Sequence, residues 1–484
     1  MTGRIAVAWA IPDRSELECG ETVAAKISPD LIARYGGNLP RYTSYPTAVS
    51  FSEAIGPRDV AGWLGALPPG QSVSLYFHVP FCDELCRFCA CNTAVMRQEE
   101  GREVYGDLLL DEMRRVVALV GRGRVVRHLH FGGGTPTTLP ESALRKVMAA
   151  VREEFRLADD AELAMEMDPR HVPEGMLTLL AELGFNRISF GVQDLDHTVQ
   201  EACGRIQSYE QTLSCVQQAH AAGVHGVNID LIYGLPYQTV ESVQDTARRV
   251  AGMRPDRLAV FGYAHVPWKQ KRQQLIPQDS LPSSEERLQQ ADMIDRVLVE
   301  EGYKPIGLDH YAHPEDAMAR AYEAGTLHRN FQGYTIDASP VLLGMGASAI
   351  SMTPDGFYQN IPSTAAYIRA LKDSDGLPVA RGVFRTEEDR WRGKVIETIM
   401  CLSGVDLTPH IPEGQSLDEA FAGELEALRP FEEDGLIRWD GNRVSLTEKG
   451  KPFLRHLAAV FDTRRKELAA GTDGRPTPRF SSSL

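Results

Sequence analysis

The stretch VSLYFHVPFCDELCRFCACN, residues 73–92, joins an apolar run to four cysteines that lie within ten positions. The whole chain of 484 residues has only eight cysteines. The run 73–79 has the length and composition of a buried strand, so the thiols are expected directly after a strand end. Three kinds of site use so many thiols in one place: a disulfide cluster, a zinc site and an iron–sulfur cluster.

The disulfide cluster is the first of these to be excluded. Disulfides are typical of oxidising compartments and of small secreted domains, whereas this chain is 43% hydrophobic and long enough for a large core and a smaller second one. The apolar run at 5–11 is followed by PDRSELE rather than by a cleavage site. No stretch reaches the roughly 18–20 apolar residues that a bilayer span needs. We therefore expect reduced thiols in a cytoplasmic protein that has no membrane segment.

The chain is acidic, with a formal net charge of −15 and a pI near 5.4. Nucleic-acid binding depends on concentrated Lys and Arg, so the composition argues against a nucleic-acid partner. An acidic substrate would need a local basic pocket within this acidic body.

The sequence alternates short apolar runs with helical patterns from about residue 73. Between the runs lie segments such as 141–156, where Leu144, Val147, Met148, Val151 and Phe155 share one helix face. Long connections of this kind favour parallel strands with right-handed crossovers. The prediction is an α/β fold, a partial (βα)6 TIM-like barrel; an open doubly wound sheet is the alternative. The expected strands are 73–79, 125–131, 161–167, 186–192, 227–234 and 257–263.

Segments on either side of this core complete the expected organisation. Residues 1–55 form an N-terminal extension that covers the active site, and residues 56–365 form the catalytic domain, with its barrel core at about 70–302. Residues 366–484 form a mostly helical, winged-helix-like domain, because 425–450 indicates a helix and then a hairpin at Asp440-Gly441. The acidic helix favours a packing or lid role over DNA binding. The last ten residues, RPTPRFSSSL, are expected to be disordered.

Polar residues recur at the carboxyl ends of several expected strands, where a barrel of this kind places its reactive groups. Because side chains on a strand alternate between faces, the polar residues on each strand share a face. We therefore expect one shared site beside the thiols. Its members are Ser74, Tyr76 and His78; Glu166 and Asp168; Ser189, Gly191 and Gln193; and Asn228 and Asp230.

A glycine run, FGGGTPT at 131–137, ends the second expected strand. Three glycines let a ligand approach the backbone closely, but a tight strand-to-helix turn would use them equally well. No GxGxxG or GK[ST] pattern follows, so neither a dinucleotide fingerprint nor a phosphate-binding loop is supported.

The spacing of the thiols separates zinc from an iron–sulfur cluster. Structural zinc prefers two separated ligand pairs, and no second pair exists because the remaining cysteines are scattered. Cys82, Cys86 and Cys89 form CxxxCxxC, which can hold three corners of a four-iron cluster. Such clusters ordinarily take four thiolates, so the fourth iron needs a ligand from elsewhere.

CxxxCxxC after the first barrel strand resembles the signature of the radical S-adenosylmethionine (SAM) enzymes. A collinear series of segments narrows the resemblance to the oxygen-independent coproporphyrinogen III oxidases, across about residues 40–352 and more weakly to the C-terminus. These segments are PRYTSYPT, YFHVPFC, CRFCAC, FGGGTPT, EMDPR, RISFGVQD, NIDLIYGLP and HRNFQGYT.

The resemblance implies an enzyme that converts two propionate groups of coproporphyrinogen III to vinyl groups, giving protoporphyrinogen IX in haem biosynthesis. It implies a 4Fe-4S cluster held by Cys82, Cys86 and Cys89, with SAM on the open iron as the source of a 5′-deoxyadenosyl radical. His78 and the non-ligating Cys91 match positions implicated in activity. Positions for a first SAM match Tyr76, Gly133, Glu166 and Ile350. Positions for a second SAM match Phe88, Gly134, Thr135, Gln193, Arg205, Asp230 and Ala264.

The substrate carries four propionates, so cations are expected near the barrel mouth. Arg41 and Arg329 are the candidates, on their position alone. We also expect a monomer and an electron donor such as a flavodoxin or ferredoxin. Arg87 departs from the aromatic residue common between the last two cluster cysteines, and Cys19 is taken as incidental.

Two rival functions are compatible with parts of the pattern. A haem chaperone of the same superfamily keeps the cluster motif but usually lacks the CxC at 89–91 and the HRNFQGYT segment, and both are present here. A zinc-stapled regulatory module with a winged helix would be colourless and would retain zinc.

Overall fold

The computed structural model describes residues 23–24 and 27–465. Cys19, the apolar run 5–11 and the C-terminal tail expected to be disordered lie outside these residues. In the described part, no helix combines the length and the apolar character needed to cross a bilayer.

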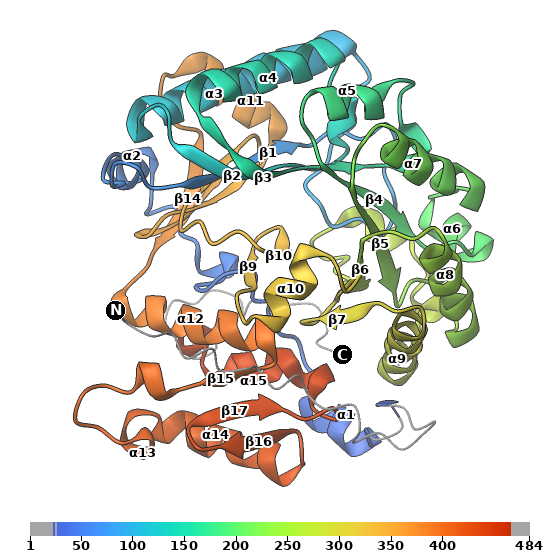
Figure 1. Cartoon of the computed structure of the whole chain (residues 1–484), viewed down its shortest axis with the longest axis vertical. Coiled ribbons are helices and arrows are strands. Elements are labelled where there is room, and N and C mark those ends of the chain that lie inside the picture. Colours follow the sequence, from blue (N-terminus) through green and yellow to red (C-terminus); the bar gives the residue numbers. More distant parts are fainter. Residues whose placement is uncertain (1–22, 25–26, 466–484) are drawn as a thin grey trace.

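Six parallel strands form the centre of the fold, as predicted, in the order β1-β2-β3-β4-β5-β6 (Figure 1). The prediction of a partial barrel is confirmed. Each expected strand is present, and the third begins five residues earlier than expected. The strands are β1 (Val73–Val79), β2 (Val125–Gly133), β3 (Arg156–Met167), β4 (Arg187–Gln193), β5 (Gly226–Tyr233) and β6 (Arg257–Gly262).

Helices between the strands cover the outside of the sheet (Figure 1). The apolar face predicted for 141–156 is buried, because Leu144, Val147, Met148 and Val151 of α4 are all inaccessible to solvent. In α9, Ser283 and Glu286 form a reciprocal capping box that starts the helix. The helices are α3 (Glu99–Val120), α4 (Glu141–Glu154), α5 (Met176–Glu182), α6 (His197–Cys203), α7 (Tyr209–Ala221), α8 (Val240–Gly252) and α9 (Ser284–Glu300).

Further strands extend the sheet at both ends. β11 pairs with β1 in parallel and is followed by three antiparallel partners, while β8 and β7 extend the other end beyond β6. The end strands of this sheet are β14 and β7, so the barrel is not closed. The added strands are β7 (Lys304–Ile306), β8 (His310–Ala312), β11 (Leu342–Met345), β12 (Ile350–Met352), β13 (Gly356–Asn360) and β14 (Val379–Phe384).

A separate hairpin, β9 (His328–Asn330) with β10 (Gly333–Thr335), lies across the inner side of the barrel. Asn330 and Thr335 of this hairpin line two cavities, one of about 160 Å³ within the barrel and one of about 360 Å³ beside it. The hairpin therefore separates the two spaces. Helices α10 (Ala317–Glu323) and α11 (Thr364–Asp373) complete this part of the chain.

The C-terminal part has the predicted winged-helix-like order, because α14 is followed directly by the hairpin of β16 and β17. Gly441, with a φ of +57°, lies in the turn that follows Asp440. β15, β17 and β16 form a small sheet in that order. The elements are α12 (Glu387–Leu402), β15 (Gly404–Asp406), α13 (Leu417–Ala420), α14 (Ala422–Glu433), β16 (Ile437–Asp440), β17 (Arg443–Leu446) and α15 (Leu454–Val460).

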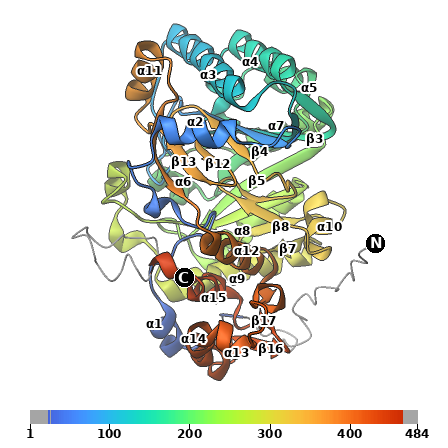
Figure 2. The ribbon, with the colours of Figure 1, turned by 90° about the vertical axis from the view of Figure 1, so that its left-hand side faces the viewer.

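The N-terminal segment packs against this C-terminal part rather than only against the barrel. Helix α1 (Pro29–Tyr35) lies beside α14 and α15 in both views (Figures 1 and 2), whereas α2 (Pro57–Gly65) packs on the barrel. Leu31, Leu39 and Tyr42 belong to the same apolar core as Ile399 and Phe461. The predicted domain limits at residues 55 and 365 stay predictions.

Candidate active site

The four clustered cysteines lie in one loop that follows β1. Backbone hydrogen bonds close the base of this loop, because Cys82 N donates to Ala94 O at 3.1 Å and Ala94 N donates to Pro80 O at 2.7 Å. All seven described cysteines of the chain are free thiols. The loop therefore presents its thiols at the carboxyl end of β1, as predicted.

The glycine run at the end of β2 packs tightly against this loop. Gly134 N donates to Val79 O at 2.8 Å and Thr135 N donates to Phe81 O at 2.7 Å. A Cβ atom on Gly134 would lie 2.5 Å from Phe81 O, and Gly133 has a φ of +114°. The glycines thus serve a tight turn that lets β2 approach the cysteine loop, one of the two interpretations of the sequence.

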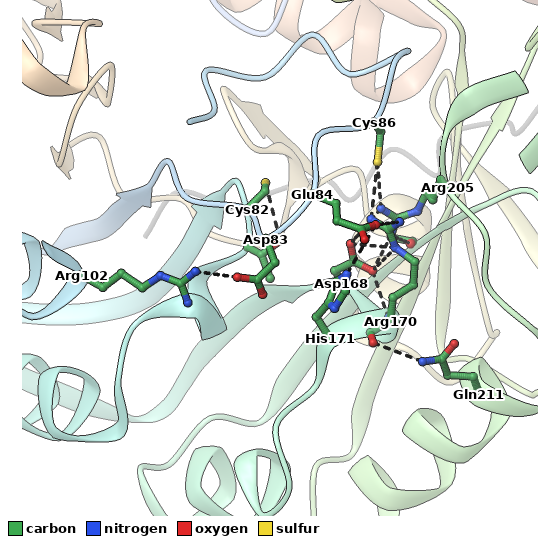
Figure 3. Close-up of polar contacts among 12 residues, drawn as sticks. Cys82, Asp83, Glu84, Cys86, Arg102, Asp168, Arg170, His171, Arg205 and Gln211 are labelled. Carbon is green, nitrogen blue, oxygen red and sulfur yellow. Dashed lines mark hydrogen bonds and ion pairs between the residues drawn. The ribbon is translucent and has the colours of Figure 1, made fainter. Parts of the chain in front are cut away.

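Two arginines donate to one of the thiols, and a single carboxylate holds both arginines (Figure 3). Cys86 Sγ accepts from Arg205 Nη1 at 3.3 Å and from Arg170 Nη2 at 3.7 Å. Asp168 Oδ2 accepts from the same two nitrogens, at 3.0 Å and 2.7 Å. Burial alone would raise the pKa of Asp168, but Arg205 and Arg170 lower it to about 2. Asp168 is therefore an anion that positions two cations beside Cys86.

The other thiols have different surroundings. A hydrogen bond from Cys91, helped by Arg272 and Arg205, lowers the pKa of Cys89 to about 6, although burial opposes this shift. Burial raises the pKa of Cys82 to about 11, and its Sγ accepts a long hydrogen bond of 3.8 Å from Thr135 Oγ1. Among the described residues, no three His, Cys, Asp or Glu side chains converge closely enough for a single metal ion. A four-iron cluster is larger, and its thiolates bind separate corners, so a loop with spaced thiols and cationic neighbours fits that group.

Glu166, at the end of β3, is oriented by two donors. His130 Nε2 lies 2.9 Å from Glu166 Oε1, and Gly133 N donates to Glu166 Oε2 at 3.0 Å. Burial would raise the pKa of Glu166, but His130 and the Gly133 amide outweigh burial and lower it. His130 was missed in the sequence; its place on the inward face of β2, two residues from His128, is the signal that would have found it.

Tyr76 and His78 form a pair on β1. His78 Nε2 lies 3.1 Å from the carbonyl oxygen of Asn92, so that nitrogen carries the proton, and His78 Nδ1 accepts from Tyr76 OH at 3.0 Å. The Asn92 contact ties β1 to the end of the cysteine loop. Burial lowers the pKa of His78, which disfavours the charged form of the ring.

Part of the predicted set of polar residues, on β3, β4 and β5, lines the 160 Å³ cavity, whereas Ser74 of β1 lines the 360 Å³ cavity on the other side of the hairpin. Glu166, Ser189, Asn228 and Asp230 all line the smaller cavity. Asp230 accepts from Asn228 Nδ2 at 2.7 Å and from Ser189 Oγ at 3.2 Å. Burial and then the charge of Glu166 raise the pKa of Asp230 to about 7.

Gln273 is a further residue that the sequence did not reveal. Its Nε2 donates to Phe88 O at 2.7 Å and to Ala264 O at 3.1 Å. It therefore joins two predicted second-SAM positions that are 176 residues apart in the chain, and no local pattern around Gln273 indicates this contact. The side chains of Gln193 and Arg205 lie close together around Gly191 of β4, because a Cβ atom on Gly191 would lie within 3.5 Å of both. Ile350, predicted for the first SAM, begins β12; a Cβ on Gly344, the β11 partner of Tyr76, would lie 2.8 Å from Ile350 O.

Hydrogen bonds from Arg87 connect the cysteine loop to the end of α6. Its backbone N donates to Cys203 O at 2.9 Å, and its Nη1 donates to Ala202 O at 3.1 Å. The departure from an aromatic residue at this position thus adds a polar link between the loop and the barrel wall.

The two arginines proposed for the substrate lie at the barrel mouth and the hairpin. Arg41 Nη2 donates to Gly262 O at 2.7 Å, at the end of β6. Arg329 stacks over Tyr334, with its Cζ 4.3 Å from the ring centroid, and its Nη1 lies 3.9 Å from Asp309 Oδ1.

Comparisons with known proteins identify the family of this chain. The Radical SAM superfamily model matches residues 76–250, and the HemN C-terminal domain model matches residues 386–453. The chain is 46% identical to the oxygen-independent coproporphyrinogen III oxidase of Bradyrhizobium diazoefficiens, over 90% of this chain and 96% of that protein. This chain belongs to the oxygen-independent coproporphyrinogen III oxidase family.

Two further comparisons place the rest of the chain in the same family. The oxygen-independent coproporphyrinogen III oxidase of Escherichia coli strain K12 is 41% identical over 91% of this chain and 96% of that protein. The solved structure of coproporphyrinogen III oxidase (HemN) from Escherichia coli, described as a radical SAM enzyme, superposes with a TM-score of 0.83. It covers 88% of this chain and 97% of that one, at 40% identity. The likeness therefore extends over the barrel and the C-terminal part together.

Proposed function

We propose that this chain is an oxygen-independent coproporphyrinogen III oxidase, which converts two propionate side chains of coproporphyrinogen III to vinyl groups to give protoporphyrinogen IX in haem biosynthesis. The observation that carries the proposal is the CxxxCxxC loop at the carboxyl end of β1, in a chain 46% identical to an oxidase of that name. The proposed cofactors are a 4Fe-4S cluster and two molecules of SAM. Together they would supply the one-electron chemistry needed to break an unactivated C–H bond.

The cluster would be held by Cys82, Cys86 and Cys89. Arg205 and Arg170 donate to Cys86 Sγ and so place two positive charges beside this proposed cluster ligand. Asp168 keeps both guanidinium groups in place. Cys91 donates to Cys89 and would stay outside the ligand set.

The first SAM would lie among Tyr76, Gly133, Glu166 and Ile350. His130 and the Gly133 amide hold Glu166 as an oriented acceptor, which suits the two hydroxyl groups of a ribose. His78 fixes the Tyr76 hydroxyl and links it to the cysteine loop. The second SAM would lie among Phe88, Gly134, Thr135, Gln193, Arg205, Asp230 and Ala264.

The remaining proposals concern partners and setting. A flavodoxin or ferredoxin would provide the electrons, and the enzyme would act as a monomer in the cytoplasm. The N-terminal segment and the C-terminal part would keep water and oxygen from the barrel mouth during radical chemistry.

Anaerobic purification and assay test the proposed function. The wild type is expected to contain four irons and four sulfides, and to form protoporphyrinogen IX from coproporphyrinogen III with SAM and reductant. Cys82→Ser, Cys86→Ser and Cys89→Ser should each lose iron and release no 5′-deoxyadenosine. Cys215→Ser is the matched control, because this buried thiol on α7 lies outside the cysteine loop and donates to Pro169 O at 3.6 Å, a bond that a serine can keep.

Three results would contradict the proposal. Full cluster content and undiminished deoxyadenosine release in any of the three loop variants would remove the cluster assignment. Haem binding without protoporphyrinogen formation would favour the chaperone. A colourless protein with stoichiometric zinc would favour the regulatory module.

A further inference from the structure

Four arginines from distant segments meet beside the carboxyl end of β6; we call Arg41, Arg287, Arg329 and Arg455 the arginine cluster. Arg41 Nη2 donates to Gly262 O at 2.7 Å, and Arg287 Nη1 donates to the next carbonyl, Tyr263 O, at 2.9 Å. A Cβ atom on Gly234, the residue after β5, would lie 2.7 Å from Arg287 Nη1. The cluster therefore lies over the ends of β5 and β6, at the barrel mouth.

The other two arginines complete the cluster from the C-terminal helix and the inner hairpin. Arg455 of α15 donates to Leu39 O at 3.3 Å, two residues before Arg41. Arg329 of β9 lies 3.9 Å from Asp309 Oδ1. Asp309 also interacts electrostatically with Arg41 and Arg455, so this one carboxylate faces three arginines of the cluster.

Positive charge is in excess here. Asp309 Oδ1 is already 2.7 Å from His310 Nδ1, and in residues 23–24 and 27–465 no ion pair joins Arg41 or Arg287 to a carboxylate. Although burial would raise the pKa of Asp309, His310 and the arginines lower it to about 2. Burial, with Arg41 and Arg287 as neighbours, lowers the pKa of Arg455 to about 10. The cations thus destabilise one another where solvent is limited.

The guanidinium groups also retain donors. A guanidinium has five N–H donors, and carbonyl oxygens accept from only part of them in Arg41 and Arg287. Among the described side chains, Arg287 Nε and both Nε and Nη1 of Arg329 are buried without a hydrogen-bond partner. Planar forks of this kind match carboxylate oxygens in pairs. The ligand that would satisfy both the charge and the geometry is a polycarboxylate.

We propose that the arginine cluster binds the propionate carboxylates that stay intact during turnover, and so places the other two propionates beside the cysteine loop. This inference rests on the proposed function. The strand order puts β6 at the far side of the six-strand barrel from β1, so a substrate anchored by the cluster extends across the mouth toward Tyr76 and Glu166. Arg287 and Arg455 thereby join Arg41 and Arg329 as specificity-determining residues.

Substrate binding without turnover tests this inference. Anaerobic equilibrium dialysis would measure the affinity of the cluster-loaded enzyme, without SAM, for coproporphyrinogen III and for its tetramethyl ester. Arg41→Gln and Arg287→Gln should each weaken binding of the acid by tenfold or more and leave binding of the ester unchanged. Arg296→Gln is the matched control, because it makes the same change on α9 nine residues further on, on the opposite helix face.

Three further measurements separate the possible failures. Circular dichroism and iron content check that each variant is folded; Arg41→Gln provides the test if the more buried Arg287→Gln does not fold. Acid binding as tight as wild type in the folded variants, or an ester that binds wild type as tightly as the acid, would overturn the inference. Product formation with an unchanged KM in both variants would overturn the inference but leave the proposed function standing. If wild type bound the acid tightly but formed no protoporphyrinogen IX, the proposed function would be wrong and the inference about the arginine cluster would stand.

Discussion

At the scale of single residues, two carboxylates in one cavity behave in opposite ways. Glu166 has two donors that offset burial, so its pKa is lowered. For Asp230, burial and then the Glu166 charge outweigh the hydrogen bonds from Asn228 and Ser189, so its pKa rises to about 7. The barrel therefore holds one fixed anion and one carboxyl that stays protonated until near neutral pH, and the difference comes from neighbours rather than from depth.

Asp230→Asn should make stability less dependent on pH. The folded protein keeps the Asp230 proton up to about pH 7, whereas the unfolded chain releases it near pH 4. The stabilisation from this proton is complete below pH 4 and is lost as the pH rises through 7. The variant has no carboxyl group to ionise at this position, so its stability does not fall as the pH rises through 7. At pH 8 its free energy of unfolding should therefore exceed that of wild type by up to about 4 kcal/mol.

Urea unfolding of the SAM-free protein at pH 5 and pH 8 checks this expectation. Asp245→Asn, an exposed carboxylate on α8, is the control and should leave the difference between the two pH values as in wild type. An equal pH dependence in Asp230→Asn and wild type would show that Asp230 ionises normally.

At the scale of elements, the turn after β2 determines how closely that strand approaches the cysteine loop. Gly133 has a φ of +114°, and a Cβ atom there would lie 2.5 Å from His78 Cε1. Any side chain at Gly133 would therefore strain the turn and push against the ring that connects β1 to Asn92.

Gly133→Ala should lower the free energy of unfolding by about 1–3 kcal/mol from backbone strain alone, and lower the iron content of the purified protein. Gly252→Ala is the control, because Gly252 ends α8 with open space around its Cα and no positive φ. It should leave iron content unchanged and stability equal or slightly higher. If Gly133→Ala were as stable as wild type, the turn and the cysteine loop would accommodate the added methyl group without loss of stability.

At the scale of the whole molecule, the described residues 27–45 and 395–461 share one apolar core beside the barrel. Tyr42 is almost fully buried in the C-terminal core, and its hydroxyl donates to Asp462 Oδ2 at 2.9 Å. Arg41 reaches the barrel mouth from the adjacent position. The packing of Tyr42 in the C-terminal core thus holds the neighbouring Arg41 beside the end of β6.

Tyr42→Phe should lower the free energy of unfolding by about 1–3 kcal/mol, because it removes a donor from the buried Asp462 carboxylate. Chemical denaturation measures the change. The control is Tyr237→Phe, since Tyr237 is 51% exposed. If the N-terminal segment also orders Arg41, the KM for the substrate should rise more in Tyr42→Phe than in Tyr237→Phe. Equal KM values in the two variants would show that the Tyr42 hydrogen bond affects stability but not substrate binding.

The sequence by itself determined the six parallel strands, the buried face of α4, the C-terminal hairpin and the thiols at the end of β1. Each of these depends on residues close together in the chain, where side-chain periodicity and loop length decide which face is buried. Only the tertiary structure brought His130 to Glu166, Gln273 to Phe88, and Arg41, Arg329 and Arg455 to Asp309. Those residues lie 20 to 268 positions apart, and their contacts depend on strand order and on the packing of the N-terminal segment against the C-terminal part, which no local pattern encodes.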